Sequence, residues 1–214
     1  MSSSGGVLIA FEGGDGAGKS TQAARLAAWL TERGHEVVAT RQPGGTPVGA
    51  AVRAILLEPA TGELSPRTEA LLYAADKAEH VDTVVLPALQ RGAVVVTDRY
   101  VDSTLAYQGA GRALTPDELQ WLVDWATRGV RPALTVLLDV DVDTGSERLT
   151  GLDRLEAEPA EFHRRIRGRF RELAEAEPTR YLVLDAGAPA DQISTAVRDR
   201  VQAVLPAVAA GASP

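Results

Sequence analysis

The chain has 214 residues, 45% of them hydrophobic and only 5% aromatic, which fits one aliphatic α/β domain and argues against disorder. Its formal net charge of −7 argues against a nucleic-acid surface and against attachment to anionic membranes, so we expect neither partner. The absence of cysteine excludes disulfides and thiolate metal sites, and the three histidines have no zinc-binding spacing.

Both ends of the chain have the composition of short disordered tails, predicted at 1–6 and 208–214 around a single domain at 7–207. The first residues lack the basic and apolar regions of a secretory signal. No stretch approaches the roughly 20 apolar residues that cross a bilayer. We therefore expect a cytoplasmic protein.

A phosphate-binding loop follows the first predicted strand, Val7 to Phe11. The pattern GxxxxGKS lets the backbone wrap around phosphates, adds the positive charge of Lys19, and places the Ser20 hydroxyl where it can ligate Mg²⁺. A helix predicted over 22–33 would direct its positive end at the same phosphates. A chance match to a glycine-rich loop is the alternative. The predicted ATP-binding residues are Gly13, Gly14, Asp15, Gly16, Ala17, Gly18, Lys19, Ser20 and Thr21.

The rest of the chain alternates between aliphatic runs and helical patterns. Further strands are predicted at 36–41, 93–98, 134–139 and 181–185, with helical patterns at 48–57 and 67–90. This alternation predicts an α/β fold, a three-layer parallel sheet with helices on both faces, whose ligands bind beyond the carboxyl ends of the strands.

Two polar segments in the second half have open interpretations. The stretch at about 150–158 is either a mobile flap or an ordinary connecting loop. The arginine-rich segment 164–171 reads as the solvated face of a helix in preference to a binding surface.

The third aliphatic run ends in Asp98 and Arg99, at the same predicted sheet edge as the phosphate-binding loop. By itself such a pair is often a surface ion pair. Behind a phosphate-binding loop, Asp98 can hold Mg²⁺ through water, and the Arg99 guanidinium suits a phosphate bound by two hydrogen bonds.

From Val7 to Asp185 the sequence resembles the bacterial thymidylate kinases. Four segments carry the resemblance: the phosphate-binding loop, the loop 41–46, the stretch 98–109, and 153–156 in the predicted flap. The resemblance implies a P-loop NTPase fold of the nucleoside-monophosphate kinase type. It also implies transfer of the γ-phosphoryl of ATP to dTMP with Mg²⁺, giving ADP and dTDP, by a homodimer.

The resemblance further implies roles for individual residues. Arg99 and Arg53 would hold the dTMP phosphate, Asp15 would lie near the sugar 3′-hydroxyl, and Tyr73 would stack on thymine. Gln108 would hydrogen-bond the base, Ser103 and Tyr107 would line its pocket, and Tyr107 would crowd a 2′-hydroxyl. Pro43 matches a proline that follows a cis peptide bond.

Some family members carry a catalytic arginine in the phosphate-binding loop and others in the flap. Gly16 occupies the loop position here, so Arg154 and Arg148 become the candidates, beside Lys19 and Arg99. Three departures limit what the resemblance implies. Lys77 replaces an arginine and so loses a forked donor to the thymine base, Gln42 replaces an acidic residue before Pro43, and the flap is shorter and has fewer arginines than is typical.

Two other readings stay open. A deoxynucleoside kinase would need a carboxylate base near a 5′-hydroxyl, for which Glu12 is conceivable. A P-loop ATPase switch would bind ATP without a small acceptor and would leave the segment 98–108 unexplained.

Overall fold

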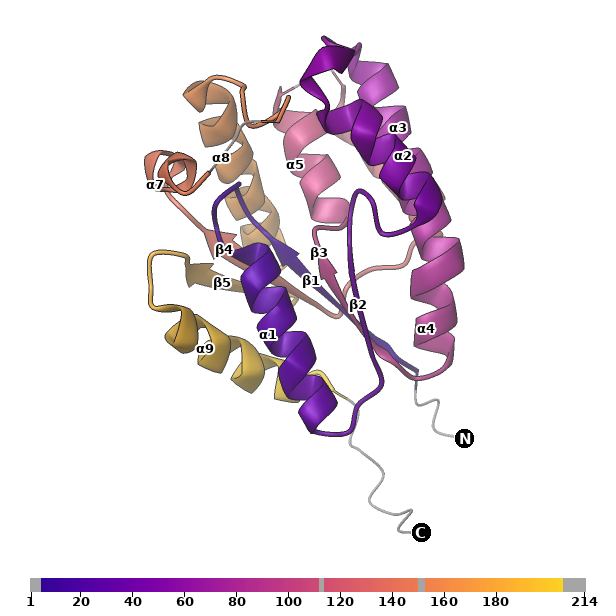
Figure 1. The fold of residues 1–214 in the computed structure, drawn as a ribbon, viewed down its shortest axis with the longest axis vertical. Helices are drawn as coiled ribbons and strands as arrows, with labels where there is room; N and C mark the ends of the chain where they lie inside the picture. The colour runs from indigo at the N-terminus through magenta and orange to yellow at the C-terminus, as the bar shows by residue number, and fades with distance from the viewer. Residues whose placement is uncertain (1–4, 112–113, 150–152, 206–214) are drawn as a thin grey trace.

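A computed structural model describes residues 5–111, 114–149 and 153–205, which form a parallel sheet between two layers of helices (Figure 1). Residues 1–4 and 208–214 of the predicted tails, and 150–152 of the predicted flap, lie outside the described residues.

The sheet contains the five predicted strands, each within one residue of its expected bounds. They are β1 (Val7–Glu12), β2 (Val37–Arg41), β3 (Val94–Asp98), β4 (Leu134–Asp139) and β5 (Tyr181–Asp185). Their order is β2-β3-β1-β4-β5, and every pair is parallel. The register places Asp98 beside both Phe11 and Arg41. The end of β1, which precedes the phosphate-binding loop, therefore lies beside the end of β3, which carries Asp98 and precedes Arg99.

Helices cover both faces of this sheet. The described helices are α1 (Lys19–Glu32), α2 (Pro47–Leu57), α3 (Pro66–His80), α4 (Leu86–Gln90), α5 (Val101–Gly111), α6 (Pro116–Thr127), α7 (Val142–Glu147), α8 (Ala160–Ala176) and α9 (Ala190–Gln202). Within the described ranges, none has the length and apolar character of a membrane span.

The two faces of β1 bury alternate side chains in two separate cores. Ile9 and Phe11 pack with α1 and α9, which lie together in front of the sheet in Figure 1. Leu8 and Ala10 pack with α3, α4, α5 and α6 on the opposite face. Burial on both faces explains why the three central strands, β1, β3 and β4, read as continuous apolar runs in the sequence.

The helical pattern predicted over 67–90 is interrupted. Between α3 and α4, residues Val81–Val85 form a π-helical turn. Pro87 has no backbone N–H and its ring would clash with the carbonyl group four residues earlier, so a regular helix cannot continue through it.

Candidate active site

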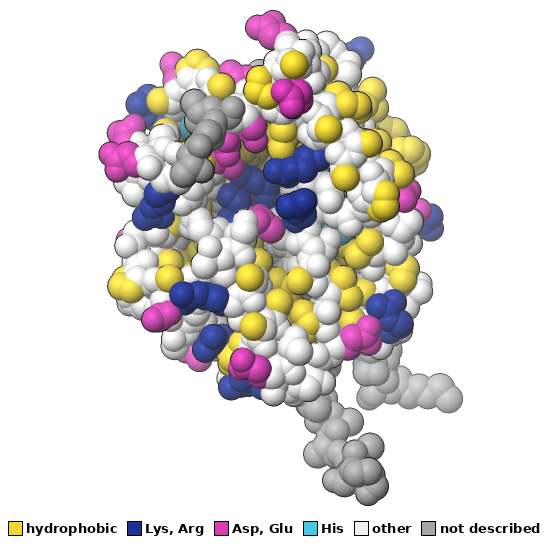
Figure 2. Space-filling view, in the orientation of Figure 1, with side chains coloured by type: hydrophobic (Ala, Val, Ile, Leu, Met, Phe, Trp, Pro, Cys, Tyr) yellow, Lys and Arg dark blue, Asp and Glu magenta, His cyan; other side chains and the backbone are white. Residues whose placement is uncertain are grey.

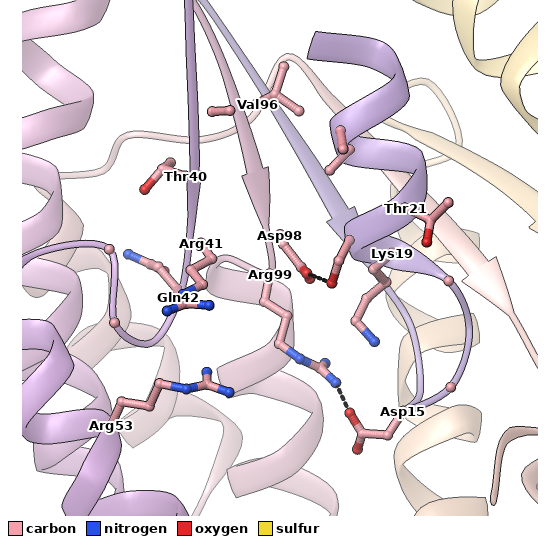
Figure 3. A pocket seen from close by; sticks show the side chains of 18 of the residues that line it. Asp15, Lys19, Thr21, Thr40, Arg41, Gln42, Arg53, Val96, Asp98 and Arg99 are labelled. Atoms are coloured by element: carbon pink, nitrogen blue, oxygen red, sulfur yellow. Dashed lines mark hydrogen bonds and ion pairs between the residues drawn. The ribbon is translucent and has the colours of Figure 1, made fainter. Parts of the chain in front are cut away.

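A polar cavity of about 750 Å³ opens at the carboxyl edge of the sheet. It is lined by the phosphate-binding loop, the ends of β2 and β3, and α1. Figure 2 shows Lys and Arg side chains gathered in this hollow, although the whole chain is acidic. Figure 3 shows Lys19, Arg53 and Arg99 converging on it from three different segments. The cavity is therefore a positively charged site suited to phosphate groups.

The phosphate-binding loop has the backbone that its glycines allow. Gly13, Gly16 and Gly18 have positive φ angles, and α1 begins at Lys19 directly after them. The buried Lys19 ammonium donates to the carbonyl oxygen of Gly14 at 2.6 Å. Burial and then the nearby charge of Arg99 lower its pKa to about 8. At neutral pH Lys19 is still mainly an ammonium ion, and a bound phosphate would favour this charged form further, because an anion stabilises a nearby cation.

Gly16 has no room for a side chain. Its φ is 74°, and a Cβ atom there would collide with the backbone carbonyl group of Gly145 in α7. An arginine at position 16 is therefore sterically excluded in this conformation, which agrees with the flap type that the family resemblance implied.

Ser20 and Asp98 lie together in the large cavity. The Ser20 hydroxyl donates to the Asp98 carboxylate (Figure 3). The described residues contain no cluster of three or more acidic or histidine ligands for a metal. A hydroxyl and one carboxylate fit Mg²⁺, which keeps several waters and takes further ligands from substrate phosphates.

Arg99 is held in place from several directions. Its φ of 66° is unusual for a residue other than glycine. Its backbone N–H donates to the carbonyl oxygen of Phe11 at 2.9 Å. Its guanidinium pairs with Asp15 and donates to Gly13 and Ser103. The side chain therefore enters the cavity in one fixed direction.

Asp15 accepts a second hydrogen bond, from the Tyr107 hydroxyl at 2.9 Å. Burial alone would raise the pKa of Asp15, but Arg99 and Lys19 together lower it to about 2. Asp15 is therefore a carboxylate at neutral pH. Its neighbour Tyr107 keeps its proton, because burial raises the pKa of this phenol well above its usual value.

A second, more enclosed cavity of about 100 Å³ adjoins the first. All nine residues predicted to bind dTMP line it: Asp15, Pro43, Arg53, Tyr73, Lys77, Arg99, Ser103, Tyr107 and Gln108. Asp15, Arg53 and Arg99 line both cavities. The structure thus places these three charged residues between two adjacent spaces, as two substrates meeting through their phosphates would require.

The loop after β2 is anchored by the buried His80. The peptide bond between Gln42 and Pro43 is cis, as the family resemblance implied. Gln42 Nε2 lies 2.8 Å from His80 Nδ1, and Thr40 Oγ1 lies 2.7 Å from His80 Nε2. With the Gln42 NH₂ group donating to Nδ1, the ring proton of His80 is assigned to Nε2. Burial and then the charge of Lys77 lower the pKa of His80 to about 4.

This network predicts an acid-sensitive fold. The unfolded state binds a proton at His80 below about pH 6.5 and the folded state only below about 4, so stability falls as the pH drops between these values. Through His80, the wild-type protein should lose about 2 to 3 kcal/mol of unfolding free energy between pH 7.5 and 4. The His80→Gln variant should not show this part of the loss. Urea denaturation across this range measures the effect, and His35→Gln is the control. Identical pH slopes for wild type and His80→Gln would refute it.

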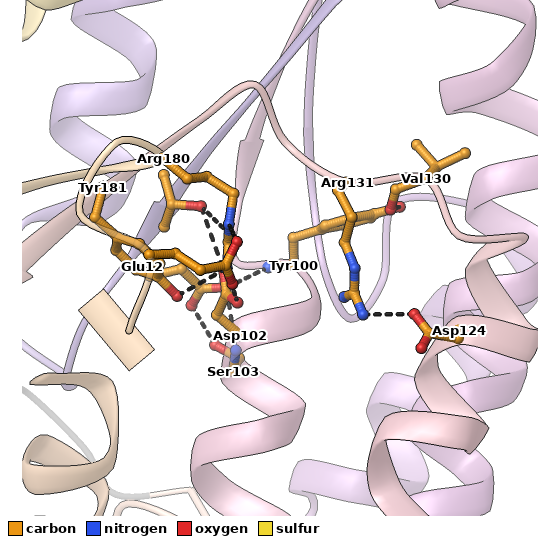
Figure 4. Close-up of polar contacts among 11 residues, drawn as sticks. Glu12, Tyr100, Asp102, Ser103, Asp124, Val130, Arg131, Arg180 and Tyr181 are labelled. Atoms are coloured by element: carbon orange, nitrogen blue, oxygen red, sulfur yellow. Dashed lines mark hydrogen bonds and ion pairs between the residues drawn. The ribbon is translucent and has the colours of Figure 1, made fainter. Parts of the chain in front are cut away.

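Glu12 is fully buried behind the site and occupied by structural contacts (Figure 4). Its Oε1 accepts the backbone N–H groups of Tyr100 and Ser103, and its Oε2 accepts the Ser103 hydroxyl at 2.5 Å. Burial, and then the Asp102 carboxylate, raise its pKa. Glu12 lines neither of the two cavities. It therefore fixes the start of α5 and is not available as a base for a nucleoside hydroxyl.

The two candidate flap arginines lie in different places. Arg148, at the end of α7, lines the large cavity and donates to the carbonyl oxygen of Gly16 at 3.2 Å. Arg154 lines neither cavity. Its guanidinium pairs with the buried Glu69 at 2.5 Å and donates to Leu56. In this conformation Arg148, and not Arg154, is positioned to face a phosphate, while the predicted catalytic role of Arg154 stays a prediction.

Two glutamates are among the residues at the site that sequence reasoning missed. Glu156 lines both cavities, although it was recognised only as part of the segment 153–156. Glu69 lies behind the smaller cavity and contacts Gln108 at 3.0 Å. Its burial could have been suspected from its position on the inner face of α3, but its partner is 39 residues away.

Comparisons with known proteins agree with this geometry. The family model described as "Thymidylate kinase" matches residues 11–197. A thymidylate kinase of Clavibacter michiganensis is 56% identical over 97% of this chain and 99% of its own length. One of Deinococcus radiodurans is 50% identical over 90% and 94%. A crystal structure of thymidylate kinase from Ehrlichia chaffeensis superposes with a TM-score of 0.76 at 32% identity, covering 92% of this chain and 99% of that one.

Proposed function

The chain belongs to the thymidylate kinase family and is an ATP-dependent kinase of dTMP, and from this premise we propose how its residues divide the reaction between the two cavities. The single observation that carries the proposal is the position of Arg99, which lines both cavities beside Lys19 and Asp15.

The large cavity takes ATP in this proposal. The backbone from Gly13 to Thr21 and the Lys19 ammonium bind its phosphates, and Arg148 faces the phosphoryl group that is transferred. Ser20 would hold Mg²⁺ directly and Asp98 would hold it through water. When bound, Mg²⁺ would neutralise part of the phosphate charge and help to orient the transferred group.

The smaller cavity takes dTMP. Arg99 and Arg53 hold its phosphate, and Tyr73, Lys77, Ser103, Tyr107 and Gln108 surround its base and sugar. The acceptor oxygen is already ionised, so no general base is needed. The residues instead hold two highly charged groups in line and exclude water.

A coupled assay of ADP release tests this assignment. We expect turnover with dTMP and none with thymidine, because the burial and occupied oxygens of Glu12 leave no base for a 5′-hydroxyl. Turnover with thymidine would support a deoxynucleoside kinase, and release of ADP that does not depend on an acceptor would support an ATPase switch.

We further propose that the chain forms a homodimer through an apolar face of α2, α3 and α6. Five exposed large hydrophobic residues lie on these helices: Val48, Ile55, Leu71, Trp121 and Trp125. The two tryptophan rings stack on each other at 6.2 Å while remaining 67% and 68% exposed. An apolar groove of about 480 Å³ lies beside them between α3 and α6. A face of this kind fits a second copy of itself, as in a two-fold symmetric dimer.

We expect Trp121→Glu to shift the protein from dimer to monomer, because a charge buried at the centre of an apolar interface has no partner. Sedimentation velocity over a concentration series measures the shift. The control is Val183→Glu, an exposed hydrophobic position on β5, away from this face. A wild-type protein that stays monomeric, or a Trp121→Glu variant that stays dimeric, would contradict the proposal.

We also propose that residues 7–207 act as one catalytic domain in the cytoplasm. The reason is the substrate, since ATP is abundant in that compartment.

A further inference from the structure

The smaller cavity contains a hydrogen-bond acceptor that has no partner in the protein. Gln108, on α5, is 1% exposed and lines this cavity with Tyr73, Lys77 and Ser103. Its Oε1 has no hydrogen-bond partner among the described residues, whereas its Nε2 does. Because buried polar atoms are nearly always paired, an unpaired acceptor at a cavity indicates a donor on the ligand.

The orientation of the Gln108 amide is set by Glu69. This fully buried residue of α3 accepts a hydrogen bond from Gln108 Nε2 at its Oε1, at 3.0 Å. Its other oxygen accepts from Arg154 Nη2 at 2.5 Å. A carboxylate accepts hydrogen bonds and cannot donate them, so only the NH₂ end of the amide can face Glu69. The oxygen end must then face the other way.

We propose that Glu69 is a positioning residue that makes Gln108 an acceptor and thereby selects the base. This inference rests on the proposed function of the cavity. Thymine and uracil carry an N–H at ring position 3 that can donate to Gln108 Oε1. Cytosine has an acceptor there and would leave two acceptors facing each other. Arg154 pairs with the other carboxylate oxygen of Glu69. In this conformation Arg154 therefore holds the Glu69 carboxylate in place, and Glu69 in turn orients the Gln108 amide.

The test is the Glu69→Gln substitution, which keeps the shape of the side chain but lets it donate. The substituted amide can offer its NH₂ group to Gln108 Oε1, and the Gln108 amide is then free to turn. We expect kcat/KM for dTMP to fall by about tenfold or more, and the ratio of kcat/KM for dTMP to that for dCMP to fall at least about tenfold. The KM for ATP is expected to stay within about twofold, since Glu69 lines neither cavity.

The matched control is Glu79→Gln, which makes the same charge change on the same helix without contact to Gln108. It should leave the dTMP to dCMP ratio unchanged. In the double variant Glu69→Gln/Gln108→Leu the ratio should equal that of Gln108→Leu alone, because Glu69 acts through the amide. A purely structural role would lower the melting temperature of Glu69→Gln but leave the ratio unchanged, and that result would overturn the inference.

A further measurement uses the wild-type enzyme and so does not depend on folding of the variant. A dTMP analogue methylated at N3 cannot donate to Gln108, and we expect its kcat/KM to be at least about a hundredfold lower than that of dTMP. Equal turnover of both would refute the acceptor role. Absence of dTMP turnover in wild type would instead refute the proposed function, so the two failures are distinguishable.

Discussion

Replacing Arg99 by alanine is expected to lower kcat/KM for dTMP on the order of a thousandfold, with little change in ATP affinity. The guanidinium lines both cavities and is held at their junction by Asp15, Gly13 and Ser103. Without it, Arg53 is left as the one arginine of the smaller cavity that is assigned to the acceptor phosphate, and Asp15 loses its guanidinium partner. Steady-state kinetics with each substrate varied, together with calorimetric ATP binding, measures the effect.

The matched variant is Arg99→Lys, which keeps the charge but loses the forked donor. We expect it to recover part of the lost turnover and not all of it, because one ammonium cannot bind Asp15 and a phosphate in the same geometry. Equal losses of ATP and dTMP affinity in Arg99→Ala would contradict the assignment of Arg99 to the acceptor.

Replacing Lys19 by methionine is expected to lower kcat on the order of a thousandfold, with a much smaller change in the KM for dTMP. Methionine keeps most of the length and the buried packing of the side chain, so the loss reports the missing charge. Lys19 contacts the loop at Gly14 and lines the large cavity but not the smaller one. Its charge therefore acts on the phosphates of ATP.

Rapid-quench kinetics, which isolate the chemical step, measure this effect. A Lys19→Met variant that keeps its single-turnover rate and loses only ATP affinity would mean that Lys19 binds the nucleotide without stabilising the transferred phosphoryl group. The melting temperature of the variant without nucleotide is the control for folding, and we expect it to be close to that of wild type or higher. The reason is that burial disfavours the ammonium form of Lys19 and lowers its pKa.

The sequence by itself determined the five strands of the sheet and the loop that binds the phosphates of ATP. Buried parallel strands need apolar residues on both faces, so aliphatic runs identified the central strands β1, β3 and β4, and shorter apolar runs identified the edge strands β2 and β5. The phosphate-binding loop was also readable, because its glycines, Lys19 and Ser20 lie within a few residues of one another and act through local backbone geometry. The nine predicted dTMP-binding residues, which all line the smaller cavity, came from the family resemblance, and Arg99 was also indicated by its position directly after the third aliphatic run.

Only the tertiary structure decided which side chains share a contact across distant segments. Arg154 was a candidate for the phosphate site, and in this conformation it lines neither cavity but pairs with Glu69, 85 residues earlier, so its catalytic role stays a prediction. Glu12 was a conceivable base from the sequence, but in the structure it accepts hydrogen bonds from the backbone at the start of α5. Its carboxylate is committed to backbone N–H groups 88 and 91 residues away. Such contacts depend on how helices cross over the sheet, which the order of residues along the chain does not encode locally.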